Sequence, residues 1–194
     1  MLRRLGALVF AAVFVTACSA HEEPVLYRAD YPQYQSADAL FDKATLVVEA
    51  RIVGEPRYLQ EQEEAPDPAE TDPNLNPNAG APAGVAAQPE APQTVITVYT
   101  AQVTKVFKGQ AQVGQSIEVK ELGGNFEGVT YAEEHTTPMN QDSGYVLFLE
   151  TYPDSPAALL NPVQAKYPLD TSSNPESLPD NTLKLTRAEL ETMS

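Results

Sequence analysis

The sequence predicts a single mainly β domain: a small antiparallel β-barrel with short flanking helices and one long disordered loop. Three observations support this fold class. About five or six apolar runs alternate with the strand period of two or are too short for buried helices. No run has the length and period of a long helix. A proline-rich acidic stretch separates the first two strand patterns, and its composition cannot support a packed core.

The first residues have the pattern of an export signal. Met1-Leu2-Arg3-Arg4 is positively charged, and the apolar run from Leu5 to Ala17 follows it. This run is shorter than the roughly 20 residues that a transmembrane helix needs. We therefore predict a signal peptide over residues 1–17.

Val15-Thr16-Ala17-Cys18 resembles the lipobox of bacterial lipoproteins, an aliphatic residue and two small residues followed by cysteine. The resemblance implies cleavage before Cys18 and transfer of a diacylglyceryl group to its thiol. Cys18 is the only cysteine, so it has no intramolecular disulfide partner. The alternative is an ordinary signal peptide cut elsewhere. The lipobox reading places the chain on the extracytoplasmic face of the cell membrane, or on the outer membrane if the host has one.

The charge of the chain restricts its partners. The formal net charge is −15, and removal of residues 1–17 takes away Arg3 and Arg4 but no acidic residue. Nucleic acids and anionic lipid headgroups both require basic surfaces. The composition therefore predicts no nucleic-acid partner, and attachment to the membrane through the lipid on Cys18.

Residues 18–35 are predicted to be a lipidated tether. They contain Pro24 and Pro32 and show neither a helical nor a strand period. The tether is expected to dock near Tyr27 and Tyr31. The folded domain then spans residues 36–194.

The first elements of the domain are a short helix and a strand. Ser36 can cap a helix that ends at Lys43, with Leu40 and Phe41 facing the core. Ala44 to Val53 has the period of two expected for a half-buried strand.

Residues 60–93 are predicted to form a disordered acidic loop rich in proline and alanine. Segments of this composition do not bury enough apolar area to offset the entropy of ordering. The loop is either a flexible binding segment or a tolerated insertion at a hairpin tip.

The remaining elements are predicted in order along the chain. Gly144–Glu150 is almost continuously apolar, which is typical of a buried central strand. Thr186-Arg187-Ala188-Glu189 is a capping box for a terminal helix. The predicted strands are Thr94–Phe107, Ser116–Leu122, Phe126–Ala132, Gly144–Glu150, and edge strands within Leu159–Tyr167 and Thr182–Leu185, with a turn or bulge at Gly123-Gly124-Asn125.

Three segments resemble a netrin-like domain, as in the tissue inhibitors of metalloproteinases. They are residues 39–53, residues 100–109 with their Phe-Lys-Gly end, and residues 144–149. The resemblance covers roughly residues 38–150 and implies a five-stranded OB-type barrel flanked by helices. Those inhibitors use an N-terminal cysteine and several disulfides, and Cys18 lies far from the barrel. Inhibitory activity is therefore not carried over.

The densest group of possible metal ligands is Glu133-Glu134-His135. A metal site needs such groups to converge, and a solvated loop is the alternative. Asp142-Ser143-Gly144 has the composition of a turn before a strand, because no Gly-x-Ser-x-Gly elbow is present. Tyr131 is either a sugar-stacking residue or a residue at the edge of the core. The sequence therefore predicts no catalytic residue, no cofactor and no metal site.

The leading functional hypothesis is a non-catalytic, lipid-anchored binding or accessory protein of the bacterial cell envelope. Its expected partner is an envelope protein, a peptide or a carbohydrate. The alternative hypothesis is a small hydrolase or metal-dependent enzyme that uses Glu133, Glu134 and His135. Convergence of these three side chains in one cavity would distinguish the two.

Overall fold

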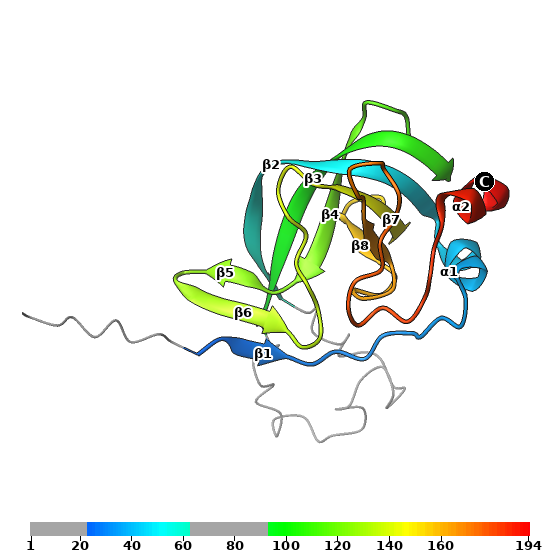
Figure 1. The fold of residues 1–194 in the computed structure, drawn as a ribbon. Coiled ribbons are helices and arrows are strands. Elements are labelled where there is room, and N and C mark those ends of the chain that lie inside the picture. Colours follow the sequence, from blue (N-terminus) through cyan, green and yellow to red (C-terminus); the bar gives the residue numbers. More distant parts are fainter. Residues whose placement is uncertain (1–22, 63–92) are drawn as a thin grey trace, which may run out of the picture.

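Residues 23–62 and 93–194 are described by a computed structural model of the chain (Figure 1). The mainly β class and the short helices are confirmed. Neither helix in these ranges has the length and apolarity needed to cross a membrane. The predicted signal peptide, Cys18 and residues 63–92 lie outside the described residues. The elements in chain order are β1 (Val25–Tyr27), α1 (Ala37–Lys43), β2 (Leu46–Gln62), β3 (Gln93–Lys108), β4 (Ser116–Leu122), β5 (Gly124–Phe126), β6 (Val129–Glu133), β7 (Gly144–Glu150), β8 (Ala157–Leu159), β9 (Lys166–Pro168) and α2 (Arg187–Met193).

The larger sheet has the strand order β2-β3-β4-β8-β7-β9, and β2 also pairs with β7. The first part of β2 pairs with β7 over Leu46–Arg51, whereas its ladder with β3 runs to Gln62. The β2–β3 ladder shifts register at three places, and Gly54 within β2 has a φ of 69°. Such irregularities bend and twist a strand. β3 and β7 pair with the two opposite edges of β2 over residues 47–51.

Most strand pairings are antiparallel as predicted, but two are parallel. β4 pairs with β8 in parallel through Val119↔Ala157 and Lys120↔Ala158, and β1 pairs with β6 in parallel. A parallel pair needs a long crossover between its strands. The intervening β5, β6 and β7 provide that connection between β4 and β8, and residues 28–128 lie between β1 and β6.

The boundaries of the predicted loop are corrected at both ends. β2 continues beyond Val53, and residues 60–62 pair with residues 93–95 of β3. Residues 60–62 are polar, so their composition does not mark them as strand. Their place in the sheet follows from backbone pairing with the apolar β3, because strand propensity depends strongly on context.

A second, three-stranded sheet has the order β1-β6-β5 and includes part of the predicted tether. Figure 1 shows β1 lying alongside β6. The predicted strand Phe126–Ala132 is instead a hairpin, and Gly124 and Asn125 belong to β5 rather than to a turn. Glu127 and Gly128 connect its strands with φ values of 51° and 86°. A two-residue hairpin turn of this kind needs positive φ at both positions, and the pair Glu-Gly is a weak signal for it.

The C-terminal strands also differ from the prediction. The predicted segment Leu159–Tyr167 overlaps only the last residue of β8 and most of β9. β9 lies at the edge of the sheet as predicted, whereas β8 lies between β4 and β7. Residues 182–185 form no strand in the described structure. The buried side chains of Leu183 and Leu185 produced the apolar pattern, although the backbone around them has no ladder partner.

The core lies between the larger sheet and the two helices. Leu147 and Phe148 on β7 have 0% exposure, as expected for the most apolar strand. Phe148 packs edge-to-face on Tyr167, with ring centroids 5.9 Å apart. Leu40 of α1 and Leu190 of α2 complete the same core, which confirms the predicted inward face of the first helix.

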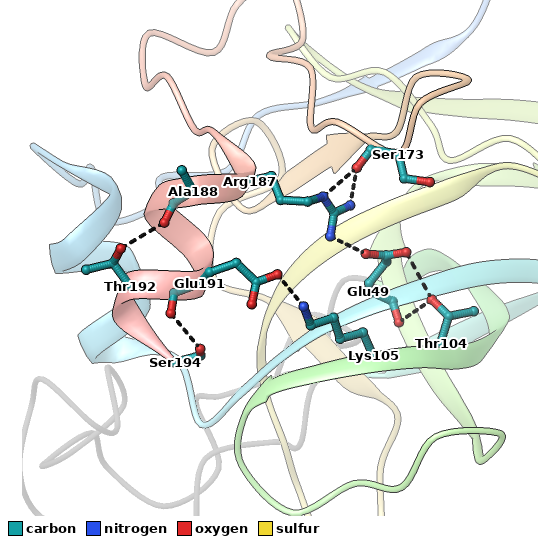
Figure 2. Close-up of polar contacts among 9 residues, drawn as sticks. All are labelled: Glu49, Thr104, Lys105, Ser173, Arg187, Ala188, Glu191, Thr192 and Ser194. Carbon is teal, nitrogen blue, oxygen red and sulfur yellow. Dashed lines mark hydrogen bonds and ion pairs between the residues drawn. The ribbon is translucent and has the colours of Figure 1, made fainter.

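Helix α2 begins with the predicted capping box and is fixed to the sheet by side chains (Figure 2). The backbone N–H of Thr186 donates to Glu189 Oε2 at 2.7 Å, and that of Glu189 donates to Thr186 Oγ1 at 3.2 Å. Arg187 Nη1 donates to Glu49 Oε2 on β2 at 2.9 Å, and its Nε donates to the Ser173 carbonyl at 2.8 Å. The helix is thereby tied to both the sheet and the preceding loop.

Candidate functional site

The site begins with an ion pair inside the fold. Lys166 on β9 is 1% exposed, and the Glu121 side chain on β4 is 7% exposed. Lys166 Nζ donates to Glu121 Oε1, while Glu121 Oε2 accepts from the Met139 backbone N–H at 3.1 Å. Both carboxylate oxygens are therefore paired, which a buried charge requires.

Glu133, at the end of β6, is a second buried carboxylate and is 8% exposed. Burial raises the pKa of Glu133, the nearby Glu121 carboxylate raises it further, and a hydrogen bond from the Tyr31 hydroxyl opposes the shift. None of the ion pairs formed within residues 23–62 and 93–194 includes Glu133. The groups that act on its charge are the Tyr31 hydroxyl and Lys166, which lower its pKa, and Glu121, which raises it.

A cavity of about 290 Å³ opens beside these two carboxylates. It lies between the face of β3 and β4 and the β5–β6 hairpin, and tyrosines from β2, β3 and β6 form much of its wall. No lysine, arginine or histidine is among its described lining residues. The residues that line it are Tyr58, Thr97, Tyr99, Glu121, Leu122, Gly123, Gly124, Asn125, Thr130, Tyr131, Ala132, Glu133, Thr136, Pro138 and Pro162.

Two glycines set the distance between the hairpin and β3. Thr97 Oγ1 donates to the Gly123 carbonyl at 2.7 Å. A Cβ on Gly124 would lie 2.5 Å from both Thr97 Oγ1 and the Tyr58 ring, and Gly124 has a φ of 134°. Only glycine fits this approach without displacement of its neighbours. Gly123, Gly124 and Asn125, which were predicted as a turn or bulge, therefore form part of the cavity wall.

Tyr27, the last residue of β1, and Arg28, which follows it, contact one side of the hairpin. The Tyr27 ring stacks on Tyr131 with centroids 5.7 Å apart, and the Tyr27 hydroxyl accepts from the Val95 N–H at 3.1 Å. Arg28 forms a two-pronged pair with Glu134, with distances of 2.8 and 2.9 Å. The docking predicted at Tyr27 and Tyr31 is found, and it positions both Tyr131 and Glu133.

The structure does not bring the three candidate residues of the enzyme hypothesis together. Glu133 turns into the cavity, and Glu134 pairs with Arg28, which lowers the pKa of Glu134 through hydrogen bonding first and charge second. His135 is exposed in a turn with a φ of 62°. Within the part of the chain that the structure describes, no group of three His, Cys, Asp or Glu side chains is arranged to hold a metal.

Two further candidates from the sequence, Ser143 and Tyr131, lie outside any catalytic arrangement of the described residues. Ser143 precedes β7 in a turn, and its hydroxyl contacts the Gln141 carbonyl at 3.5 Å. Tyr131 is half-buried, and one face of its ring lies against Tyr27. Cys18, the predicted lipidation site, lies outside the described residues.

Sequence reasoning missed the most important members of this site, Glu121 and Lys166. Both lie in strands whose alternation predicts a strand but not the direction in which each polar side chain points. The single available signal was Lys166 between Ala165 and Tyr167, a charge in an apolar context that calls for a buried partner.

Comparisons with protein-family models, with curated proteins and with solved structures found no match for this chain. The site is therefore interpreted from its own geometry.

Proposed function

We propose that this chain is a lipid-anchored binding module of the bacterial cell envelope, built on an OB-like barrel. Its ligand site is the cavity between β3, β4 and the β5–β6 hairpin. The observation that carries the binding function is this cavity, which combines three tyrosines with two buried carboxylates. A concave site with aromatic walls and a few convergent polar groups is the usual form of a small-molecule site.

The strand pairings support the barrel part of the proposal. Followed from neighbour to neighbour, the pairings run from β2 through β3, β4, β8 and β7 and return to β2. That cycle is the connectivity of a five-stranded barrel. The shortest ladders in this cycle are β4–β8 and β7–β8, each with two residue pairs. The netrin-like resemblance of residues 38–150 implies the same architecture.

The lipid anchor rests on Val15-Thr16-Ala17-Cys18. Two acyl chains, at about 0.8 kcal/mol for each buried CH₂ group, would hold the chain on the membrane nearly permanently. Metabolic labelling with a palmitate analogue tests this. Cys18→Ala is expected to abolish labelling, and equal labelling of variant and wild type would refute the anchor.

The binding site is tested with a tryptophan reporter, because the natural chain has no tryptophan. Asn125 is exposed on the cavity wall, so Asn125→Trp places one indole at the site. The probes are a panel of small amines, amino acids, dipeptides and monosaccharides. A saturable change in emission is expected for at least one class.

Val113→Trp is the matched control, since Val113 is 70% exposed and lies in the segment between β3 and β4, away from the cavity lining. If no probe changes the Asn125→Trp emission, or if both reporters respond equally, the proposed site is wrong.

A further inference from the structure

The charge balance around the cavity is uneven. Glu121 is neutralised by Lys166, and Glu134 by Arg28. Glu61, which lines the adjoining cavity of about 210 Å³, is paired with Lys120. Glu133 lines the larger cavity and is more than nine-tenths buried, yet it forms no ion pair among the described residues, because the nearby Lys166 is paired with Glu121. A buried carboxylate in this position either stays protonated or receives a cation from outside the chain.

The walls of the cavity favour a cation. Tyr58, Tyr99 and Tyr131 line it, and the face of an aromatic ring attracts positive charge. The Glu121 carboxylate lies at the same cavity, with its charge balanced by Lys166. Anions find no positively charged side chain among the described lining residues.

The donor set suits an organic cation better than a metal ion. A divalent metal prefers several converging carboxylates, and the described residues offer no group of three metal-ligating side chains. One carboxylate between tyrosines instead matches an ammonium group, which forms one charge-assisted hydrogen bond and packs its alkyl chain against aromatic rings.

We propose that the cavity binds a small organic amine, whose primary ammonium pairs with Glu133 while its alkyl chain lies against Tyr58 and Tyr131. This inference rests on the proposed binding function and specifies its ligand class. The structure assigns Glu133 as the residue that recognises charge. The Tyr31 hydroxyl acts on the Glu133 carboxylate and opposes the rise in its pKa.

The pH dependence follows from the groups that face Glu133. They are Tyr31 from the segment after β1, Glu121 from β4 and Lys166 from β9. An ammonium binds the ionised carboxylate, and burial raises the pKa of Glu133. Amine affinity is therefore expected to fall as the pH decreases through that raised pKa.

The test uses the Asn125→Trp reporter with three probes of equal chain length: n-butylamine, 1-butanol and butyrate. Butylamine is expected to give a saturable emission change, with at least about tenfold weaker responses to the other two. A tenfold change corresponds to roughly 1.4 kcal/mol, within the range of one charge-assisted hydrogen bond. Introducing Glu133→Gln into the Asn125→Trp reporter should weaken butylamine binding by about tenfold or more.

Glu127→Gln is the matched control, because Glu127 is an exposed carboxylate in the turn of the same hairpin and does not line the cavity. It is expected to leave butylamine binding unchanged. If Glu133→Gln does not fold, Tyr58→Leu provides a second variant, since Tyr58 is 41% exposed and its loss removes one ring from the wall. Tyr58→Leu should weaken binding several-fold.

The outcomes separate this inference from the proposed function. A response to monosaccharides, butanol or butyrate without a stronger response to butylamine would refute the amine and leave the binding site standing. Equal butylamine affinity in Glu133→Gln and the parent would refute the role of Glu133. No response to any probe of the full panel would refute the binding site itself.

Discussion

Lys166 and Glu121 form the most deeply buried ion pair of the described residues. Removing both charges from water is costly, and their attraction repays that cost only while the geometry is complete. The pair also connects strands that do not neighbour each other, β4 and β9. Its role in the fold is therefore to fix relative position rather than to add net stability.

We predict that Lys166→Met lowers the free energy of unfolding by about 3–5 kcal/mol, because it leaves Glu121 buried without a counter-ion. Adding Glu121→Gln should recover most of that loss, since the amide oxygen can still accept from Met139. Urea denaturation of both variants measures the difference. A double variant as unstable as the single one would show that the ion pair itself is strongly stabilising.

For Glu133 we predict that removing the charge raises the free energy of unfolding, in contrast to Lys166→Met. Its folded-state pKa is raised, so its contribution to stability is complete below the unfolded pKa and is lost as the pH rises through the folded pKa. Glu133→Gln is therefore expected to be more stable than wild type at pH 7, by on the order of 1 kcal/mol. Thermal denaturation between pH 4 and 8 in buffers without amines should show a flatter profile for the variant. A variant that is less stable at pH 7 would contradict this reasoning.

At the scale of elements, α2 is attached to the sheet by two ion pairs of different burial (Figure 2). In the Arg187–Glu49 pair the side chains are 28% and 16% exposed, and in the Lys105–Glu191 pair they are 40% and 45% exposed. Exposed pairs contribute little, because water screens them and their side chains lose entropy. The two pairs therefore allow the stabilising effects of a partly buried and a more exposed ion pair to be compared on one helix.

We expect Arg187→Ala to lower the free energy of unfolding by about 2 kcal/mol, because it also removes the hydrogen bonds to the Ser173 carbonyl. Lys105→Ala should change it by less than about 0.5 kcal/mol. Guanidinium unfolding of the two variants gives the comparison. Equal losses would mean that α2 is held by its Leu190 contact with the core instead.

Both helices were predictable from local chemistry, since Ser36 and Thr186 cap them as their sequences indicate. The strands Ser116–Leu122 and Gly144–Glu150 were also predictable, because their residues carry a clear apolar pattern. β1 was not, since a three-residue strand between prolines exists only through pairing with β6. The same holds for the site: Glu133 was noticed as a possible ligand, but its burial depends on Tyr31 and on the hairpin.

At the scale of the whole molecule, the β2–β3 ladder ends with Gln62 directly opposite Gln93. Direct partners at the end of an antiparallel ladder can be joined by a two-residue turn. Replacement of residues 63–92 by Asn-Gly is therefore expected not to lower the free energy of unfolding, and the smaller entropy of closing a short loop should raise it by up to about 2 kcal/mol. Chemical denaturation of the shortened chain tests this, and a loss above about 2 kcal/mol would mean that the replaced segment contributes contacts to the domain.

The pairing of β2 with both β3 and β7 has a consequence for the order of folding. At the start of the ladder with β7, Thr45 donates to the carbonyl of Leu149, which lies 104 positions further along the chain. Contacts this distant in the chain form slowly, because the entropy of closing the intervening loop is lost before the contact can compensate for it. A chain synthesised from its N-terminus cannot complete β2 until β7 has emerged from the ribosome. If the proposed signal peptide directs export, this late completion leaves a period in which the chain is still unfolded enough to be translocated.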